Sequence, residues 1–405
     1  MELKFGQHVY EQAQELRQQG KDANQTAKVL CDRDQDGHNY GIGIVLGGDG
    51  KPVATTDILL HYTEAEVKGS TIGTYSNSAA LMEQLKSAIL TWQRIPEQYW
   101  GNFKLALPSD AGTGAVKTAL EMALALDERM TTIGLEELGW PAYKAMAKLS
   151  RVNWKEFPLD AVIDDDAILP LYQSGPMNTT GFVQAVETVQ ARAKAAADKK
   201  SWVLLDRAYP GFEFARLLPE ESYDTVMRKS YALQIQPFLE QGTPFFLAIS
   251  PTKAFVSFAL RPCGMLLVYN PDASQLRDIA TLMNHAVRAR GSSFEHPATR
   301  AFVKIMTQNP AALEAAHQTT LERLAEAEAL WRKLVRGTSM EYLYADNYAG
   351  LFRNPKCREN AEVAIYNQHV YPVFSQGRCR QNMTGIPRDE ELARKHVAAF
   401  AEQCY

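Results

Sequence analysis

Short apolar runs alternate with amphipathic stretches along most of this chain. Apolar runs of about four to eight residues, bounded by turn residues, are typical of buried strands. They predict strands at residues 103–108, 167–172, 202–206 and 244–250. Apolar residues at helical spacing predict helices near residues 81–90, 116–125, 182–189 and 272–290. Strands that alternate with helices are the pattern of an α/β fold with a mostly parallel sheet.

The two ends of the chain carry further helices and strands. Residues 11–31 predict a helix with a break at Gly20. Residues 310–336 predict one long helix, and a helix of that length suits a bridge between a large and a small domain. Its apolar positions are Leu313, Leu321, Leu324, Ala327, Leu330 and Trp331. The apolar pattern of the C-terminal part predicts strands at residues 361–366 and 370–374 and a last helix at residues 390–403.

Composition narrows the class of protein. The chain has 405 residues, of which 46% are hydrophobic and 22% charged, and its formal net charge is −4. This length allows a large core and two or more domains. The slightly acidic net charge does not indicate a nucleic-acid-binding surface. No run approaches the roughly 18 apolar residues of a membrane span. The N-terminus lacks the pattern of a secretory signal. We expect a soluble enzyme with neither a nucleic-acid nor a membrane partner.

Metal sites and disulfides are not expected. The five cysteines are scattered and odd in number, which argues against a disulfide framework or a zinc site and favours a reducing cytoplasm. Residues 32–37 open like a calcium-binding EF-hand loop, with aspartates at the first, third and fifth positions. The twelfth position, where that loop needs a bidentate glutamate, is Gly43, and no helix pair fits around the loop.

The strand expected at residues 244–250 leads into a stretch with candidate chemistry. Ser250 is followed by Lys253, Arg261 and Gly264. A lysine at the end of a buried strand is poorly placed for a solvated surface charge. An amine in a desolvated pocket has a lowered pKa and can form a Schiff base with a carbonyl. Arg261 offers a planar fork suited to a phosphate, and Ser250 a hydroxyl for the same anion. The alternative is a strand end whose lysine and arginine have no special role.

This stretch resembles the lysine segment of the aspartate and aromatic aminotransferases, which are pyridoxal-phosphate (PLP) enzymes of fold type I. In that family the lysine carries the cofactor as an internal aldimine, so the resemblance implies that Lys253 is the catalytic residue. It also implies that Ser250 and Arg261 bind the cofactor phosphate. The fold implied is α/β, with a mixed, mostly parallel seven-stranded sheet in a large domain and a small α+β domain.

Further motifs of the same family follow in family order and cover nearly the whole chain. Gly112-Thr113-Gly114 resembles the phosphate cup, and a small-residue turn at a helix N-terminus suits an anion. Trp140 resembles the tryptophan that stacks on the pyridine ring. Tyr143 stands where the family commonly has a histidine.

Three polar residues resemble the family's ligands of the cofactor ring. Asn178 and Tyr209 match the asparagine and the tyrosine that bond the ring oxygen. Asp206 ends an apolar strand, where a carboxylate is costly to bury unless it pairs with a cation. The resemblance implies that this cation is the protonated pyridine nitrogen, which makes the ring an electron sink.

The remaining matches concern the substrate and a neighbouring subunit. Residues 39–51 align with a segment that lines the substrate pocket, which places Gly43 there. Arg380 matches the arginine that binds the substrate α-carboxylate, although Arg378 is a rival by position. Two residues resemble contacts across a dimer interface: Tyr75 to the cofactor phosphate, and Arg288 (or, alternatively, Arg290) to an acidic substrate side chain.

The resemblance implies a PLP-dependent aminotransferase. It would move an amino group between an acidic or aromatic L-amino acid and a 2-oxo acid through the Lys253 aldimine, as a homodimer with active sites at the interface. Residues 1–50 would form the N-terminal segment and part of the small domain, 51–310 the large PLP-binding domain and 311–405 the small C-terminal domain. Two alternatives remain: another PLP reaction such as β-elimination or decarboxylation, and a non-catalytic binding protein.

Overall fold

A seven-stranded sheet organises the larger part of the molecule. The computed structural model describes residues 4–53, 57–69, 75, 78–291 and 295–405. The strands follow the order β2-β8-β7-β6-β5-β3-β4. Neighbouring strands are parallel from β7 to β4, whereas β8 is antiparallel to both β7 and β2. The bounds are β2 Phe103–Ala106, β3 Thr132–Glu136, β4 Asn153–Phe157, β5 Ile168–Gln173, β6 Val203–Arg207, β7 Phe245–Ile249 and β8 Met265–Tyr269. The predicted mixed, mostly parallel sheet is confirmed.

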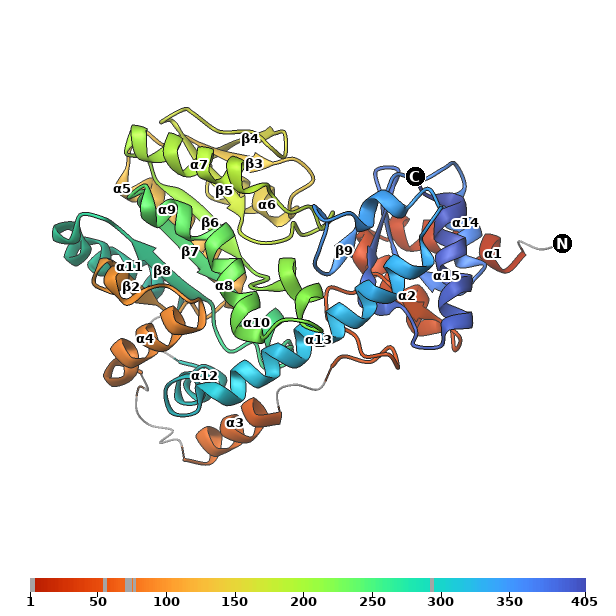
Figure 1. Ribbon diagram of the computed structural model, residues 1–405, viewed down its shortest axis with the longest axis horizontal. Coiled ribbons are helices and arrows are strands. Elements are labelled where there is room, and N and C mark those ends of the chain that lie inside the picture. Colours follow the sequence, from red (N-terminus) through yellow and green to blue (C-terminus); the bar gives the residue numbers. More distant parts are fainter. Residues whose placement is uncertain (1–3, 54–56, 70–74, 76–77, 292–294) are drawn as a thin grey trace.

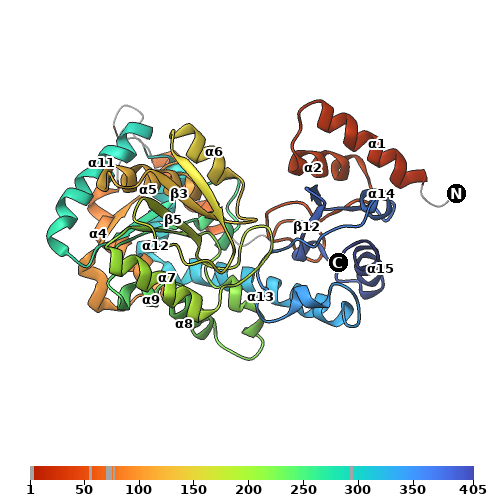
Figure 2. The same ribbon diagram turned by 90° about the horizontal axis from the view of Figure 1, so that it is seen from above.

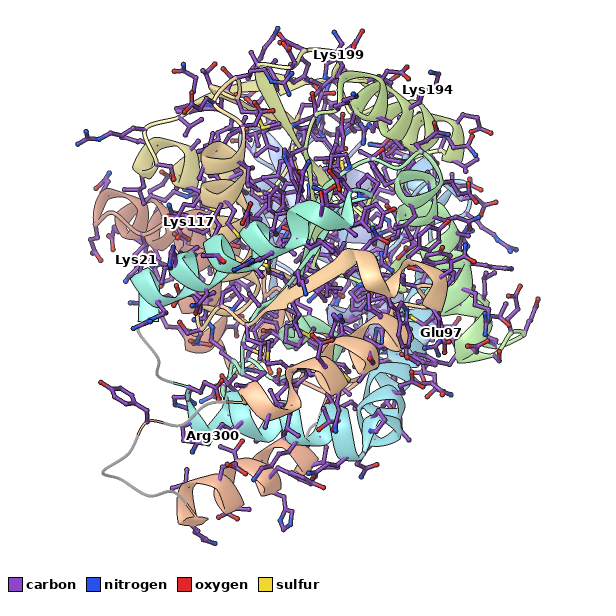
Figure 3. All side chains as sticks on the ribbon, turned by 90° about the vertical axis from the view of Figure 1, so that its left-hand side faces the viewer. Lys21, Glu97, Lys117, Lys194, Lys199 and Arg300 are labelled. Carbon is purple, nitrogen blue, oxygen red and sulfur yellow. The ribbon has the colours of Figure 1, made fainter. Side chains whose placement is uncertain are left out.

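Helices cover both faces of this sheet (Figure 1). Along β7, Phe245, Leu247 and Ile249 face one hydrophobic core, while Phe246 and Ala248 face the other. That alternation follows from the two-residue period of a strand, and every residue of β7 is buried. The helices of this lobe are α3 Asp57–Gly69, α4 Met82–Trp92, α5 Ala111–Leu126, α6 Ala142–Leu149, α7 Val186–Lys199, α8 Tyr223–Gln234, α9 Gln236–Glu240, α10 Pro251–Ala254, α11 Leu276–Gly291 and α12 Pro297–Gln308. Lys194 and Lys199 of α7 lie at the outer edge of the lobe (Figure 3).

The two ends of the chain come together in a smaller lobe (Figures 1 and 2). A third hydrophobic core joins Val9 and Leu30 from the N-terminal helices with Phe400 from the last helix. The elements here are α1 Lys4–Gln18, α2 Ala23–Arg33, β1 His38–Asn39, β9 Phe352–Arg353, α14 Ala361–Tyr366, β10 Val370–Tyr371, β11 Val373–Ser375, β12 Arg378–Asn382 and α15 Glu390–Gln403. The predicted domain bounds themselves stay a prediction.

Helix α13 (Pro310–Leu334) connects the lobes. Leu313 packs in a core of the large lobe, and Leu321, Leu324 and Trp331 pack in the core of the small lobe. The long helix and its bridging position, both expected from the sequence, are confirmed. Within the described residues, no helix is both long and apolar enough to cross a membrane.

Several predicted elements differ from the structure. Residues 361–366 form helix α14, not a strand, because so short an apolar run does not distinguish the period of a helix from that of a strand. Helix α5 begins at Ala111, five residues earlier than the apolar pattern showed, since its first turn contains glycine and threonine. The break at Gly20 is confirmed, and Gly20 has a φ of 83°. The acidic stretch after α2 leads into strand β1 rather than into a second helix.

Candidate functional site

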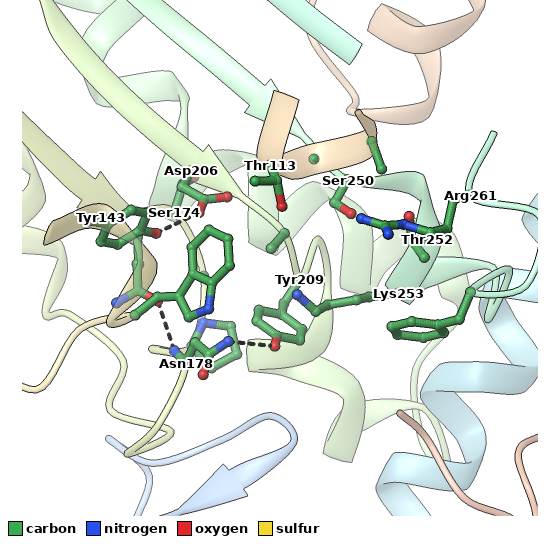
Figure 4. Close-up of a pocket in the computed structure, with 18 residues that line it drawn as sticks. Thr113, Tyr143, Ser174, Asn178, Asp206, Tyr209, Ser250, Thr252, Lys253 and Arg261 are labelled. Atoms are coloured by element: carbon green, nitrogen blue, oxygen red, sulfur yellow. Dashed lines mark hydrogen bonds between the residues drawn. The ribbon is translucent and has the colours of Figure 1, made fainter. Parts of the chain in front are cut away.

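A cavity of about 320 Å³ opens where the parallel strands end (Figure 4). Parallel α/β sheets bind ligands at the carboxyl ends of their strands. Gln173 and Asp206 come from the ends of β5 and β6, Ser250 follows β7, and the first turn of α5 closes one side. Nine of the residues singled out from the sequence line this cavity: Gly112, Thr113, Trp140, Asn178, Asp206, Tyr209, Ser250, Lys253 and Arg261.

Lys253 lies in the middle of the cavity wall. It belongs to α10, a single helical turn that begins directly after β7, and its neighbours Thr252 and Ala254 are buried. Its Nζ lies 4.7 Å from the centroid of the Tyr209 ring. The amine is therefore turned into the cavity rather than toward bulk solvent, as the strand-end argument required (Figure 4).

Asp206 forms an acidic end of the cavity. The hydroxyl of Tyr143, on α6, donates a hydrogen bond of 2.5 Å to Asp206 Oδ2. Burial raises the pKa of Asp206, while the bond from Tyr143 and the charge of Lys253 act to lower it. Because burial dominates, these two partners leave the ionised carboxylate incompletely compensated.

Ser250, Arg261 and the start of α5 form the opposite, anion-attracting end. The side chains of Ser250 and Arg261 lie beside one another there (Figure 4). The first turn of a helix offers free backbone N–H groups and the positive end of its dipole. A Cβ on Gly112 would lie only 2.5 Å from the Cβ of Ser250, so only glycine lets the helix start approach this close.

The backbone around this end is held in uncommon conformations. Ala111, Val256 and Arg261 have φ values of 54°, 45° and 39°. A positive φ is unfavourable for any residue with a Cβ and most of all for a β-branched one such as Val256. Such strain is typical of binding and catalytic sites, where surrounding structure holds it in place.

Three buried polar atoms of the cavity lining have no hydrogen-bond partner among the described residues. Asn178 Nδ2 donates a hydrogen bond of 3.1 Å to the hydroxyl of Tyr209. In contrast, Asn178 Oδ1, Thr252 Oγ1 and Gln173 Nε2 are buried without a hydrogen-bond partner among the described residues. Buried polar atoms are normally satisfied, so these three indicate a polar ligand. Trp140 adds an aromatic wall.

These features fit PLP. A phosphate suits the end formed by Ser250, Arg261 and α5, a protonated ring nitrogen suits Asp206, and an aldehyde suits the amine of Lys253. Four residues that also line the cavity were given no role from the sequence: Gln173, Ser174, Thr252 and Phe258. Thr252 could have been identified, because it lies between Ser250 and Lys253 in the motif. The other three do not belong to a motif with a recognisable spacing.

Five further candidates do not line this cavity. Gly114 lies one step along α5, and its carbonyl accepts a bond of 2.9 Å from Arg290. Tyr75 is 81% exposed, and Arg288 is exposed too. Gly43 lies in the small lobe, with a Cβ position 3.6 Å from the Phe352 ring.

Arg380, the fifth, reaches toward the site from strand β12. Its Nη2 donates hydrogen bonds to Asn24 Oδ1 (2.5 Å) and to the carbonyl of Gly41 (2.9 Å), and its guanidinium lies 4.5 Å from the Phe352 ring centroid. Its Nε is buried without a partner among the described residues. Burial lowers the pKa of Arg380, and Tyr209, a residue of the cavity wall, acts to raise it. The rival Arg378 instead donates to the carbonyl of Asn354.

Comparison with known proteins identifies the family. The family model described as aminotransferase class I and II matches residues 95–384, well over half of the chain. The chain belongs to this family. The family resemblance seen in the sequence is thereby confirmed.

Solved structures of this family share the fold. The aromatic-amino-acid aminotransferase of Burkholderia pseudomallei, solved with covalently bound pyridoxal phosphate, has a TM-score of 0.74 at 14% identity. The match covers 94% of this chain and 96% of that one. The aspartate aminotransferase of Saccharomyces cerevisiae cytoplasm has a TM-score of 0.73 at 17% identity, covering 94% and 96%. Fold type I is thus confirmed.

One curated relative is an aminotransferase with a different substrate in its name. Histidinol-phosphate aminotransferase 2 of Burkholderia pseudomallei (strain 1710b) is 26% identical over 204 residues. That match covers 43% of this chain and 56% of the relative, so the chain spans little more than half the length of the curated relatives it matches. The three names differ in substrate, and none fixes the substrate of this chain.

The uncompensated charge of Asp206 should lower the unfolding temperature of the cofactor-free protein, which a variant can test. Asp206→Asn removes a carboxylate whose pKa is raised by burial. The pKa of Asp206 is therefore higher in the folded protein than in the unfolded chain. At a pH above the folded-state pKa, the ionised carboxylate lowers the free energy of unfolding. This effect disappears at a pH below the unfolded-state pKa, because the carboxyl group is then protonated in both states. We expect the cofactor-free variant to unfold at a higher temperature than the parent near neutral pH, and the difference to shrink on acidification. Calorimetry of the two proteins across pH checks this.

Tyr143→Phe is the matched variant, since it removes the bond to the charged form of Asp206. It should lower the unfolding temperature near neutral pH, with an effect that also shrinks in acid. Equal and pH-independent shifts in both variants would mean that Asp206 carries no uncompensated charge.

Proposed function

We propose that this chain is an aminotransferase that moves an amino group between an L-amino acid and a 2-oxo acid with PLP. The observation that carries the proposal is the arrangement along one cavity: the amine of Lys253 lies between a carboxylate and an anion-binding end. A single ligand with a basic ring nitrogen, an aldehyde and a phosphate satisfies all three. Bound PLP supplies an electron sink for the charge that develops at the substrate Cα.

Lys253 has two tasks in this proposal. Its amine carries the cofactor, and once displaced by the substrate amine it serves as the base that removes the proton from the substrate Cα. Its place on a one-turn helix anchored between β7 and buried neighbours holds the amine near that atom. Tyr209 limits the movement of the amine because the Nζ rests over its ring.

Arg380 binds the substrate α-carboxylate in this proposal. One of its terminal nitrogens is held by Asn24 and Gly41, which fixes the plane of the guanidinium. The buried Nε is left to donate a charge-assisted hydrogen bond to the substrate carboxylate. Gly43 lies on the same side, near Phe352, where it leaves room for the substrate.

Dicarboxylic and aromatic amino acids are the substrates that we propose, with the active form a homodimer. Arg288, at the end of α11, is exposed and has no polar contact in the described part of the chain, so it is free to serve a neighbouring subunit. Arg290 is held by the Gly114 carbonyl and by Thr118 Oγ1 (2.8 Å). The exposed Tyr75 is the second proposed contact across the interface.

We also propose a cytoplasmic location for the enzyme. Its five cysteines are free, even though two of them, Cys357 and Cys404, have their Sγ atoms 3.8 Å apart. Thiols so close together persist in a reducing compartment.

Replacing the cavity lysine tests the proposed function. Lys253→Ala should still bind PLP, without a covalent link, and should lose transamination by several orders of magnitude since the base is gone. Borohydride reduction followed by peptide mass spectrometry should find the cofactor on Lys253 in the parent and on no residue in the variant. Lys117→Ala is the control, because Lys117 does not line the cavity and its Nζ donates a hydrogen bond of 2.8 Å to Ser150 Oγ. Near-parental turnover of Lys253→Ala, or turnover of the parent that needs no 2-oxo acid, would contradict the proposal.

Arg288→Ala tests the proposed substrate class and interface. Loss of a charged pair costs about 1.5–3 kcal/mol per hydrogen bond, so kcat/KM for aspartate or glutamate should fall at least roughly tenfold. The value for an aromatic amino acid should barely change. Arg290→Ala is the matched comparison, and because Arg290 braces the start of α5 it should impair both substrates. An equal loss for both substrates in Arg288→Ala would leave Arg288 without a role in specificity.

A further inference from the structure

Three cysteines that are far apart in the sequence meet in the small lobe. Cys357 follows β9, Cys379 lies in β12 and Cys404 follows α15. Their Sγ atoms all lie within 4.8 Å of one another, and those of Cys357 and Cys404 are 3.8 Å apart. This cluster is outside the cavity described above, and the proposed transamination makes no use of it.

Backbone hydrogen bonds hold the three segments in place. Lys356 and Tyr405 exchange both backbone bonds, at 3.1 and 3.0 Å, which sets Cys357 directly opposite Cys404. In an antiparallel pair, the residues next to such a doubly bonded pair approach closely. The N–H of Cys379 donates to the carbonyl of Pro355 at 3.0 Å, which brings the third cysteine to the same point. The geometry of the thiols is therefore preorganised by the fold.

The 3.8 Å between the Sγ atoms of Cys357 and Cys404 matches the spacing of thiolates in a metal site. Three thiolates bound tetrahedrally to one Zn²⁺ at about 2.3 Å have sulfur–sulfur distances of about 3.8 Å. A disulfide, in contrast, needs about 2.05 Å between its sulfurs. Buried free thiols also occur as apolar packing groups, but packing alone does not require three sulfurs to converge on one point.

The ligand set and its surroundings favour a soft ion. Within the described residues the group consists of cysteines alone, and thiolates select Zn²⁺, Cd²⁺ or Cu⁺ over harder ions. Cys379 and Cys404 are fully buried, whereas Cys357 is half-buried and borders a surface hollow lined also by Arg358 and Arg378. The hollow gives an ion access and leaves room for water as a fourth ligand.

We propose that Cys357, Cys379 and Cys404 bind one thiophilic d¹⁰ metal ion, such as Zn²⁺, through three thiolates. The bound ion ties the last residues of the chain to strand β12 and so stabilises the small lobe. The scattered spacing of these cysteines, which argued against a zinc site, hid a cluster that only the fold assembles.

Titration of the reduced, PLP-loaded enzyme tests the proposal. Cd²⁺ should produce a thiolate charge-transfer absorption that saturates at one ion per chain, and Zn²⁺ should displace it in competition. Cys357→Ser and Cys404→Ser should each weaken binding at least roughly tenfold, since each removes a ligand and even the loss of an outer-shell partner costs about 10–100-fold. The ion should raise the unfolding temperature of the parent but not of these variants.

Cys31→Ser is the control. Cys31 is a half-buried thiol of the same lobe but lies outside the cluster, and its pKa is raised to about 11, mainly by burial and further by Asp32 and Asp34. It should bind as the parent does. No saturable binding by the reduced parent, binding that survives in Cys357→Ser, or an equal loss in Cys31→Ser would overturn the proposal. If Cys404→Ser does not fold, the half-exposed Cys357 position decides the matter by itself.

Discussion

A carboxylate held at one end of a cavity is the constraint on which the proposed site depends. Burial raises the pKa of Asp206, and neither Tyr143 nor Lys253 fully offsets that effect. At the other end, Ser250, Arg261 and the start of α5 attract an anion. A ligand with a cationic nitrogen and a phosphate has one favourable orientation between these ends, and that orientation presents its remaining reactive group to Lys253.

The sheet explains why these groups meet. Parallel strands β5, β6 and β7 end at one edge, so Gln173, Asp206 and Ser250 come from three strands without any long loop. Close packing then holds strained backbone in place. A Cβ on Gly264 would lie 2.1 Å from the carbonyl of Ala111, so glycine there lets the chain pass against the start of α5, where Ala111 has a φ of 54°. The stability of the packed sheet thus offsets the cost of unfavourable backbone conformations at the site.

Much of the fold and of the cavity could be predicted from the sequence. Buried strands such as β7 are continuous apolar runs, and Asp206, Ser250 and Lys253, which the motifs singled out, line one cavity. Short elements could not be predicted in the same way, as the helical residues 361–366 show, because six residues do not distinguish two periods. The three-cysteine cluster was also invisible, since its members are joined only by tertiary hydrogen bonds. Tyr75 and Arg288 stay predictions, because a single chain contains no interface.

A crystal structure of the enzyme with bound PLP would show directly how the cavity holds the cofactor. We expect the phosphate to contact Ser250, Arg261 and the first turn of α5, with the ring nitrogen within hydrogen-bond distance of Asp206. We also expect a covalent link between the cofactor and the Nζ of Lys253. A phosphate placed beside Asp206 and Tyr143, or a link to a different lysine, would contradict the proposed site.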